Sequence, residues 1–430
     1  MPPSLSKLNG LMRSTALSEL ARRTGEPAIS WLIKLSLDRP KLISLAAGFT
    51  DNQSLPVAEA AELLHDVLKP GKRGQSALQY GSTAGDPQLR ERTLKRIEKL
   101  DDRATGFTPE NVIITHGSQQ LLYMLTEALC NPGDIVLVED PTYFVYLGIL
   151  QSHGIKARAV RLAPSGLDIN HLEQVLTQLK RSGELPRVKM LYQVTYFQNP
   201  TGWTSPHHRK AAALDLLRKY ERAAAHPIYL LEDAAYRELR FAGDDEPSAL
   251  AVRKHRDRVL YAGTYSKPFA TGARVGFGIL PEPLRTAVLR IKGNHDFGTA
   301  NLLQQLLLRA LETCKYEAHL ADIHARYQRK ARIMTAAIKS HFPSNVTRAE
   351  PRGGLYVWAT LPAGKTSGVK SRLFRTALQR DVLYVPGELC HAEDPARRKP
   401  NGDMRISFGG AADADIPVGI ARLGSILRDL

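Results

Sequence analysis

The stretch GTYSKPFATGAR, residues 263–274, follows a short apolar run and carries one lysine, Lys267. Hydroxyl groups lie one and three positions before this lysine, at Ser266 and Thr264, and Arg274 follows it by seven positions. Most lysines are solvated surface charges, but a lysine directly after a buried strand lies at the edge of a sheet. The strands around this segment therefore determine whether Lys267 is a surface residue or part of a site.

Short apolar runs alternate with segments of helical periodicity from about residue 108 onward. This alternation predicts an α/β fold, with a mostly parallel sheet covered by helices on both faces. The expected strands are NVIIT (111–115), DIVLVE (134–139), IKARAV (155–160), VKMLYQV (188–194), IYLLED (228–233), RVLYAGT (258–264) and RVGFGIL (274–280).

The pattern changes beyond about residue 300. Long helical patterns at 302–313 and 316–340 are followed by short strands mixed with helices, which predicts a smaller α+β domain. We expect both chain ends to build it. The predicted organisation is an N-terminal segment (1–50) joining the small domain, a large domain (51–300) and a small C-terminal domain (301–430).

Composition narrows the function classes. The 430 residues include 59 Lys and Arg against 43 Asp and Glu, a net charge of +16, and the basic residues are scattered. Scattered charge favours attraction for small anions over specific nucleic-acid binding. No run is long enough to cross a bilayer, and the first residues lack an apolar signal segment. We therefore expect no nucleic-acid or membrane partner.

The three cysteines, Cys130, Cys314 and Cys390, are far apart. They imply no disulfide framework and fit a reducing compartment, so we expect a cytoplasmic location. Cys390 and His391 are adjacent, but no second pair is placed to complete a zinc site, and no metal is expected.

Ligands of open α/β sheets bind beyond the carboxyl ends of the strands, where this chain has several polar groups. The segment HGSQQ (116–120) opens a helix, whose free N–H groups attract anions. The turn FQNPTGWT (197–204) and Asp233 follow two further strands. Each feature alone is typical of a turn or helix cap. Together with Lys267 and Arg274 they suit a phosphorylated aromatic aldehyde, which the lysine would bind as a Schiff base. Asp233 would then keep a ring nitrogen protonated, and Arg274 would pair with the phosphate.

The sequence resembles the pyridoxal 5'-phosphate (PLP) aminotransferases of fold type I, class I/II, and within them the subgroup of aminoadipate and aromatic aminotransferases. The motifs occur in the family's order and rough spacing. They are QYGSTAGDPQLRE (79–91), GSQQ (117–120), NPTG (199–202), EDAAY (232–236), TYSKPFATGARVGF (264–277) and MRISFG (404–409).

The resemblance implies a role for each matching residue. Lys267 is implied to be the Schiff-base lysine and proton shuttle, with Asp233 on the pyridine nitrogen and Arg405 on the substrate α-carboxylate. Asn199 and Tyr236 are implied to bind the ring hydroxyl. The remaining implied contacts are Tyr143 on the ring face, Ser118, Gln119, Thr264, Ser266 and Arg274 on the phosphate, Gly48 beside the substrate, and Tyr80 on the phosphate of the neighbouring subunit in a homodimer with shared sites.

Three positions depart from the family pattern. Ala47-Gly48 replaces a common pair of glycines, and Pro268 follows the lysine. Trp31 stands near the place where acid-reading relatives carry an arginine, and an apolar wall there would leave a second carboxylate unpaired. We expect an aminotransferase that moves the amino group of a neutral, aromatic or long-chain L-amino acid to a 2-oxo acid such as 2-oxoglutarate.

Two other functions fit the same scaffold, because a fold does not fix a reaction. One is a PLP-dependent lyase, decarboxylase or racemase. Arg405 favours chemistry that keeps the α-carboxylate, and so transamination over decarboxylation. The other is a transcription regulator with an aminotransferase-like domain, which the charge of +16 keeps open. Only about forty residues precede ISLAAG (43–48), and we expect these to be too few for a DNA-binding domain.

Overall fold

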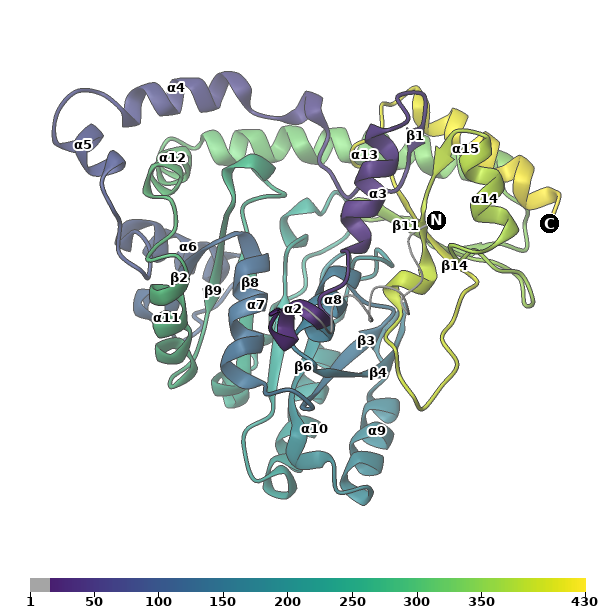
Figure 1. The fold of residues 1–430 in the computed structure, drawn as a ribbon. Coiled ribbons are helices and arrows are strands. Elements are labelled where there is room, and N and C mark those ends of the chain that lie inside the picture. The colour runs from purple at the N-terminus through teal and green to yellow at the C-terminus, as the bar shows by residue number, and fades with distance from the viewer. Residues whose placement is uncertain (1–15) are drawn as a thin grey trace.

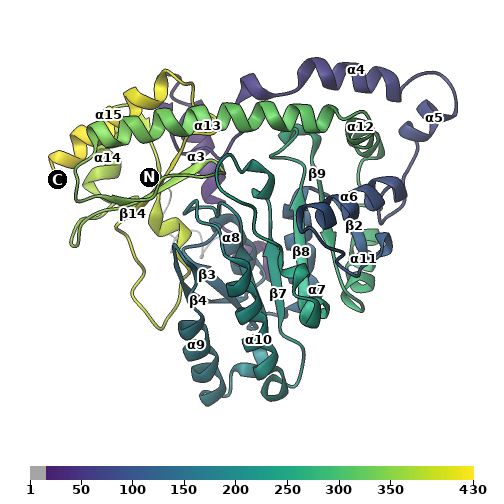
Figure 2. The ribbon, with the colours of Figure 1, turned by 180° about the vertical axis from the view of Figure 1, so that it is seen from behind.

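The computed structural model describes residues 16–430, and its largest element is an eight-stranded sheet with the strand order β2-β9-β8-β7-β6-β3-β4-β5. Helices lie on both sides of this sheet (Figures 1 and 2). The strands are β2 (Val112–His116), β3 (Ile135–Asp140), β4 (Lys156–Ala163), β5 (Gly166–Leu167), β6 (Val188–Val194), β7 (Tyr229–Asp233), β8 (Val259–Thr264) and β9 (Val275–Ile279).

The pairings β8–β7, β7–β6, β6–β3 and β3–β4 are parallel, whereas β9 runs antiparallel to both β2 and β8. Helices cover both faces, so the central strands are mostly apolar, and β7 and β8 are buried at every position. The connection from β8 to β9 contains only the short 3₁₀ helix Thr271–Ala273, which is too little for a crossover, and β9 therefore returns antiparallel. Lys267 lies in this connection.

Of the helices around the large sheet, α12 (Asn301–Glu312) begins and ends within one residue of the predicted range 302–313. Helix α7 packs on β2, β8 and β9, and α9 packs on β4 and α10. The helices of this part are α4 (Val57–Val67), α5 (Lys72–Leu78), α6 (Pro87–Leu100), α7 (Gly117–Leu129), α8 (Phe144–Ser152), α9 (Ile169–Arg181), α10 (His207–Ala224), α11 (Leu284–His295) and α12 (Asn301–Glu312).

A second, antiparallel sheet of four strands has the order β10-β11-β14-β13. It contains β10 (Thr347–Arg348), β11 (Tyr356–Thr360), β13 (Val385–Pro386) and β14 (Asp403–Ser407), and it is accompanied by α14 (Arg372–Gln379) and α15 (Asp415–Arg428). The long helix α13 (Lys315–His341) runs from α12 to this part of the molecule (Figure 1). The predicted α/β fold with a second, smaller sheet is confirmed.

The N-terminal segment contains α2 (Glu19–Arg23), α3 (Ala28–Leu37) and β1 (Ile43–Ser44). Strand β1 pairs in parallel with β12 (Val382–Leu383), so the N-terminal segment contacts the C-terminal part of the chain. The exact boundaries at residues 50 and 300 remain predictions. Among the described residues, no helix combines the length and apolar character that a membrane span requires.

A buried ion pair holds the N-terminal segment to the C-terminal part. Lys330 of α13 is fully buried, and its Nζ donates to Asp51 Oδ2 at 2.7 Å and to the carbonyls of Gly409 and Ala411 at 3.1 and 2.6 Å. Arg326 also donates to Asp51 Oδ2, at 2.6 Å. Burial raises the pKa of Asp51, but the hydrogen bonds from Arg326 and Lys330 outweigh it and lower the pKa below the ordinary value.

Lys330→Met should lower the free energy of unfolding by about 3 kcal/mol, because it leaves buried oxygens without their donor. Urea unfolding of the purified protein measures this change. Lys339→Met, an exposed position on the same helix, is the matched control and should change the free energy by less than about 0.5 kcal/mol. Equal effects of the two substitutions would show that the buried pair contributes nothing to stability.

Candidate active site

A cavity of about 240 Å³ lies beyond the carboxyl ends of β6, β7 and β8, at the position expected for a ligand of an α/β sheet. Phe49 of the N-terminal segment closes part of it. Ten of the residues predicted from the sequence line the cavity: Ser118, Gln119, Tyr143, Asn199, Asp233, Tyr236, Thr264, Ser266, Lys267 and Arg274.

The anion-binding end of the cavity is the start of α7. Gly117 has a φ of +71°, and a Cβ there would lie 2.7 Å from Arg274 Nη2, so glycine leaves this corner open. The first N–H groups of a helix have no partner within the helix, and the helix dipole adds partial positive charge. Arg274 is exposed and has only long hydrogen bonds of 3.5 Å, to Ser266 Oγ and the His116 carbonyl. Its guanidinium is therefore available to a phosphate.

The amino group of Lys267 enters the cavity from the β8–β9 connection. Its Nζ donates to the Gly48 carbonyl at 2.8 Å, and within residues 16–430 it has no ion-pair partner. Loss of hydration on burial, together with the positive charges of Arg274 and Arg405, lowers the pKa of this amine to about 8. A neutral amine, which is the nucleophilic form, is therefore accessible near physiological pH.

Asp233 ends β7, lines the same cavity and has no basic partner in the described part of the chain. The Tyr192 hydroxyl donates to Oδ2 at 2.9 Å, and the Ala235 N–H donates to Oδ1 at 3.1 Å. Burial outweighs these two hydrogen bonds and raises the pKa of Asp233 to about 6. A protonated ring nitrogen at this place would supply the missing cation and favour the ionised carboxylate.

A hydrogen-bonded group of Asn199, Tyr236 and Tyr356 leads from the cavity to Arg405. Asn199 Nδ2 donates to the Tyr236 hydroxyl at 3.3 Å, and the Tyr236 and Tyr356 hydroxyls are 3.0 Å apart. Arg405 of β14 donates through Nη1 to Asn199 Oδ1 at 2.7 Å and through Nη2 to the Ala46 carbonyl at 2.5 Å. Its guanidinium lies 4.4 Å from the centre of the Tyr356 ring, and Nε has no partner. Both protein acceptors are neutral, so a carboxylate would bind this buried guanidinium more strongly than they do.

The structure brings Gly48 to the site but not Trp31 or Tyr80. A Cβ on Gly48 would lie 2.5 Å from the Tyr356 hydroxyl. Trp31 does not line the cavity, because it lies on a face of α3 that packs against Phe374 of α14, with ring centres 5.9 Å apart. Tyr80 is 82% exposed and contacts Phe297 outside the cavity.

Three residues of the site were not predicted from the sequence, namely Tyr192, Tyr356 and Glu139. Glu139 of β3 is completely buried and has no basic partner among the described residues. Its Oε2 accepts from the Val194 N–H at 2.9 Å and from Gln198 Nε2 at 3.1 Å. Burial outweighs these bonds and raises the pKa of Glu139 to about 8, so the carboxyl is neutral at pH 7. Gln193 Oε1, which has no partner, would accept the acid proton if the amide were turned over.

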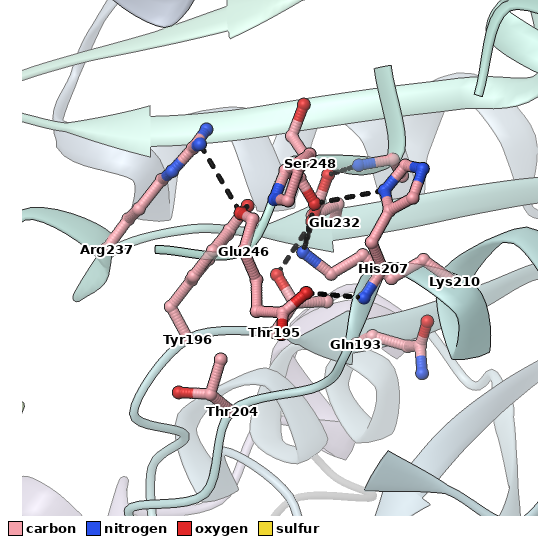
Figure 3. Close-up of polar contacts among 12 residues, drawn as sticks. Gln193, Thr195, Tyr196, Thr204, His207, Lys210, Glu232, Arg237, Glu246 and Ser248 are labelled. Carbon is pink, nitrogen blue, oxygen red and sulfur yellow. Dashed lines mark hydrogen bonds and ion pairs between the residues drawn. The ribbon is translucent and has the colours of Figure 1, made fainter. Parts of the chain in front are cut away.

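A second group that was not predicted surrounds Glu232 of β7 (Figure 3). Glu232 precedes Asp233 on β7, so the two side chains point to opposite faces. Glu232 accepts from Thr195 Oγ1 at 2.8 Å and from the Ala249 N–H at 2.7 Å, and it pairs with Lys210 at 3.0 Å. Both charged side chains are fully buried. The sequence showed an acid next to Asp233, but nothing in it indicated that Lys210 of α10 is the partner of this acid.

These residues provide the donor set that PLP requires. The cavity is lined by an open corner with an arginine for a phosphate, by a carboxyl that has no cation among the described residues and could face a ring nitrogen, and by a lysine amine. Gly276 completes the fit, because a Cβ there would overlap the backbone of Gly117 and Ser118 at the start of α7. Within the described ranges, no group of three or more His, Cys, Asp or Glu side chains is placed to hold a metal ion. The fold and site define a PLP-dependent enzyme of fold type I.

Comparison with known proteins gives the same class. Residues 40–423 match the family described as aminotransferase class I and II, and the chain belongs to this family. It is 31% identical to the aromatic-amino-acid aminotransferase 1 of Thermococcus litoralis, over 96% of this chain and 94% of the relative. It is 32% identical to the 2-aminoadipate transaminase of Thermus thermophilus, over 97% and 98% of the two chains. The kynurenine aminotransferase of Pyrococcus horikoshii, solved in complex with PMP, superposes with a TM-score of 0.87 and 30% identity, over 98% and 99% of the chains.

The family assignment confirms several predictions from the sequence. The protein is a class I/II aminotransferase that depends on PLP, with aromatic and aminoadipate aminotransferases among its relatives. The roles of the individual site residues remain predictions.

The buried Glu139 carboxyl should make stability depend on pH. Its pKa is raised in the folded protein, so the unfolded chain releases this proton first as pH increases. The contribution of protonated Glu139 to the free energy of unfolding is complete below about pH 4.5 and is lost progressively as pH rises through about 8. The loss between pH 5 and 8 is about 3 kcal/mol. Glu139→Gln keeps the shape without the acid and should remove this component from urea unfolding curves.

Glu19→Gln, at a side chain that is 75% exposed, is the control and should keep the dependence of the wild type. If Glu139→Gln also kept the full loss of stability between pH 5 and 8, Glu139 would not be the group responsible.

Proposed function

We propose that the protein transfers the amino group of a neutral, aromatic or long-chain L-amino acid to a 2-oxo acid such as 2-oxoglutarate, with Lys267 as the covalent anchor of PLP and as the base. The observation that carries this proposal is the Lys267 amine, whose pKa is lowered to about 8, in a cavity between Asp233 and an open anion site. When bound, PLP stabilises negative charge at the substrate Cα.

The residues around the cavity have separate proposed tasks. Arg405 holds the substrate α-carboxylate, replacing its contacts with Asn199 and Ala46. The neutral amine of Lys267 takes the proton from the substrate Cα and delivers it to the cofactor. Asp233 keeps the ring nitrogen protonated. Further proposed contacts are Asn199 and Tyr236 to the ring hydroxyl, Tyr143 on the ring face, and Ser118, Gln119, Thr264, Ser266 and Arg274 to the phosphate.

Lys267→Ala should abolish turnover and the adduct that borohydride traps between PLP and the protein. With the wild-type apoprotein, the rate of adduct formation should rise with pH through about 8, because only the neutral amine attacks the aldehyde carbon. Peptide mapping by mass spectrometry locates the adduct. Lys34→Ala, at an exposed lysine of α3, should behave as the wild type. An adduct on any other lysine would refute the proposed site.

The preference for neutral or long side chains is supported by the apolar residues at the cavity and by the relatives. Phe49 lines the cavity, and Phe144 lies 5.4 Å from the Arg405 guanidinium. An apolar surface leaves a short second carboxylate without a partner. The aromatic and aminoadipate aminotransferases are relatives at 31% and 32% identity. Trp31 has no direct part in this argument, because its ring packs against Phe374.

In half-reactions followed by the loss of cofactor absorbance, phenylalanine, tyrosine and 2-aminoadipate should exceed aspartate in kcat/KM by about tenfold or more. The same assay distinguishes transamination from the other reactions of this scaffold, because each donor should yield its 2-oxo acid. Aspartate as the best donor would contradict the proposed preference, and carbon dioxide or a D-amino acid as the product would contradict transamination.

We also propose a homodimer in which Tyr80 of one chain contacts the phosphate in the site of the other. Tyr80 lies outside its own cavity, and exposed apolar side chains also occur at Leu78 of α5 and Val57 of α4, which are 71% and 74% exposed. Mixing equal amounts of Tyr80→Ala and Lys267→Ala chains should restore about a quarter of wild-type activity. About half of the dimers are then mixed, and each mixed dimer has one intact site of its two. A fully active monomer would exclude shared sites. The cytoplasm remains the proposed location, on the grounds of three widely spaced cysteines.

A further inference from the structure

His391 lies between two carboxylates that belong to different sheets. Its Nδ1 is 3.1 Å from Oδ2 of Asp140, the last residue of β3 in the large sheet. Its Nε2 is 3.1 Å from Oδ2 of Asp403, the first residue of β14 in the small sheet. The ring is 5% exposed and follows the 3₁₀ helix Gly387–Cys390. One side chain thus connects the two sheets of the molecule.

This position favours the charged ring. A neutral imidazole has one N–H and would turn a lone pair toward one of the two carboxylates. The imidazolium donates from Nε2 to Asp403 and places its positive charge 3.1 Å from Asp140 Oδ2, although Nδ1 does not have hydrogen-bond geometry toward that oxygen. Burial opposes the charge, but the contacts with Asp140 and Asp403 outweigh it and raise the pKa of His391 above its ordinary value. The ring is therefore charged at pH values where an exposed histidine is neutral.

The other polar groups around His391 are accounted for by their own partners. Arg397 pairs with Asp140, and Thr360 Oγ1 donates to Asp403 Oδ1 at 2.6 Å. In the segment that follows the histidine, Glu393 pairs with Lys399, and Asp394 pairs with Arg158 of β4. On the preceding element, burial raises the pKa of the Cys390 thiol to about 12, so this neighbour is neutral. Trp358 of β11 contributes only its ring, with the two ring centres 6.0 Å apart.

The two carboxylates are close in sequence to two residues of the proposed site. Asp403 precedes Arg405 by two positions on β14, and alternate residues of a strand point to the same face. Asp140 precedes Tyr143, which lines the cofactor cavity, by three positions. The intervening Thr142 N–H donates to the Cys390 carbonyl at 2.8 Å, which adds a second link between the same segments. His391 therefore joins the strand that carries Arg405 to the loop that carries Tyr143.

We propose that charged His391 is a positioning residue, which holds Arg405 at the distance from the cavity that a substrate carboxylate requires. It acts through Asp403 and Asp140 and does not touch the substrate. The inference rests on the proposed role of Arg405, but it makes a separate claim, namely that the affinity for carboxylates depends on the charge of a histidine between the sheets.

The test is the dissociation constant of the holoenzyme for 3-phenylpropionate, an unreactive carboxylate, measured by calorimetry from pH 6 to 9. The charged ring is lost as pH rises through its raised pKa, so the wild-type constant should increase on the alkaline side of pH 6.5. His391→Gln should raise the constant by about tenfold at pH 6.5 and flatten this pH dependence. The affinity for PLP should stay within about twofold of the wild type, because the residues of the cofactor cavity are unchanged.

Asp403→Asn removes the charge of one of the two carboxylates beside the ring and keeps the shape of that side chain. It should raise the dissociation constant and flatten its pH dependence, as His391→Gln does. His255→Gln is the matched control, since His255 is a buried histidine 2.6 Å from a carboxylate of Asp215 and lies outside the site. It should leave both the constant and its pH dependence unchanged.

An unchanged constant in His391→Gln, with only a lower melting temperature, would overturn the inference and leave His391 as a structural brace. Parallel losses of carboxylate and PLP affinity would also overturn it, because the substitution would then loosen the whole site. A wild-type holoenzyme that binds no carboxylate at all would instead contradict the proposed role of Arg405.

Discussion

The amino group of Lys267 is the group on which the rest of the site depends. The positive charges of Arg274 and Arg405 both lower its pKa, and among the described residues its one close acceptor is the neutral carbonyl of Gly48. An ammonium ion in this position has lost hydration and gained no counter-ion, so the neutral amine is favoured. A paired carboxylate would stabilise the charged form and remove the nucleophile. The absence of an acid beside Lys267 in residues 16–430 is therefore as important as the presence of the two arginines.

Buried charged groups are paired on one face of the large sheet and unpaired at the cavity on the other. On the cavity face of the sheet, Asp233 has no cation among the described residues. Glu139 lies on the opposite face, beside Gln193 and in register with Glu232, and burial holds it neutral. On the same face as Glu139, Glu232 is matched by Lys210 at 3.0 Å. The Glu232–Lys210 pair holds the strand end rigid, whereas the unmatched Asp233 lies where a ligand can supply the missing charge. The stability of the site and its capacity to bind are thus assigned to different faces of the same strands.

The features that could be predicted from the sequence are those that depend on local pattern. Apolar runs and helical periods predicted the large sheet, and the polar residues at the strand ends predicted the cavity that Lys267 and Asp233 line. Contacts between distant elements could not be predicted in this way. Tyr356 reaches Tyr236 from a strand of the other sheet, and nothing in its own segment indicates that reach. Trp31 stood at the expected place in the sequence, but the direction of its side chain is set by packing against α14. The pair Cys390-His391 was set aside as a zinc site, yet its histidine lies between two sheets, because a spacing pattern does not register partners 251 and 12 residues away.

A crystal structure of the protein with PLP is the measurement that tests the central claim most directly. The account predicts electron density continuous from Lys267 Nζ to the cofactor, the phosphate at the start of α7 beside Arg274, and the ring nitrogen within hydrogen-bond distance of Asp233. Cofactor density joined to a different lysine, or a phosphate placed away from the start of α7, would contradict it.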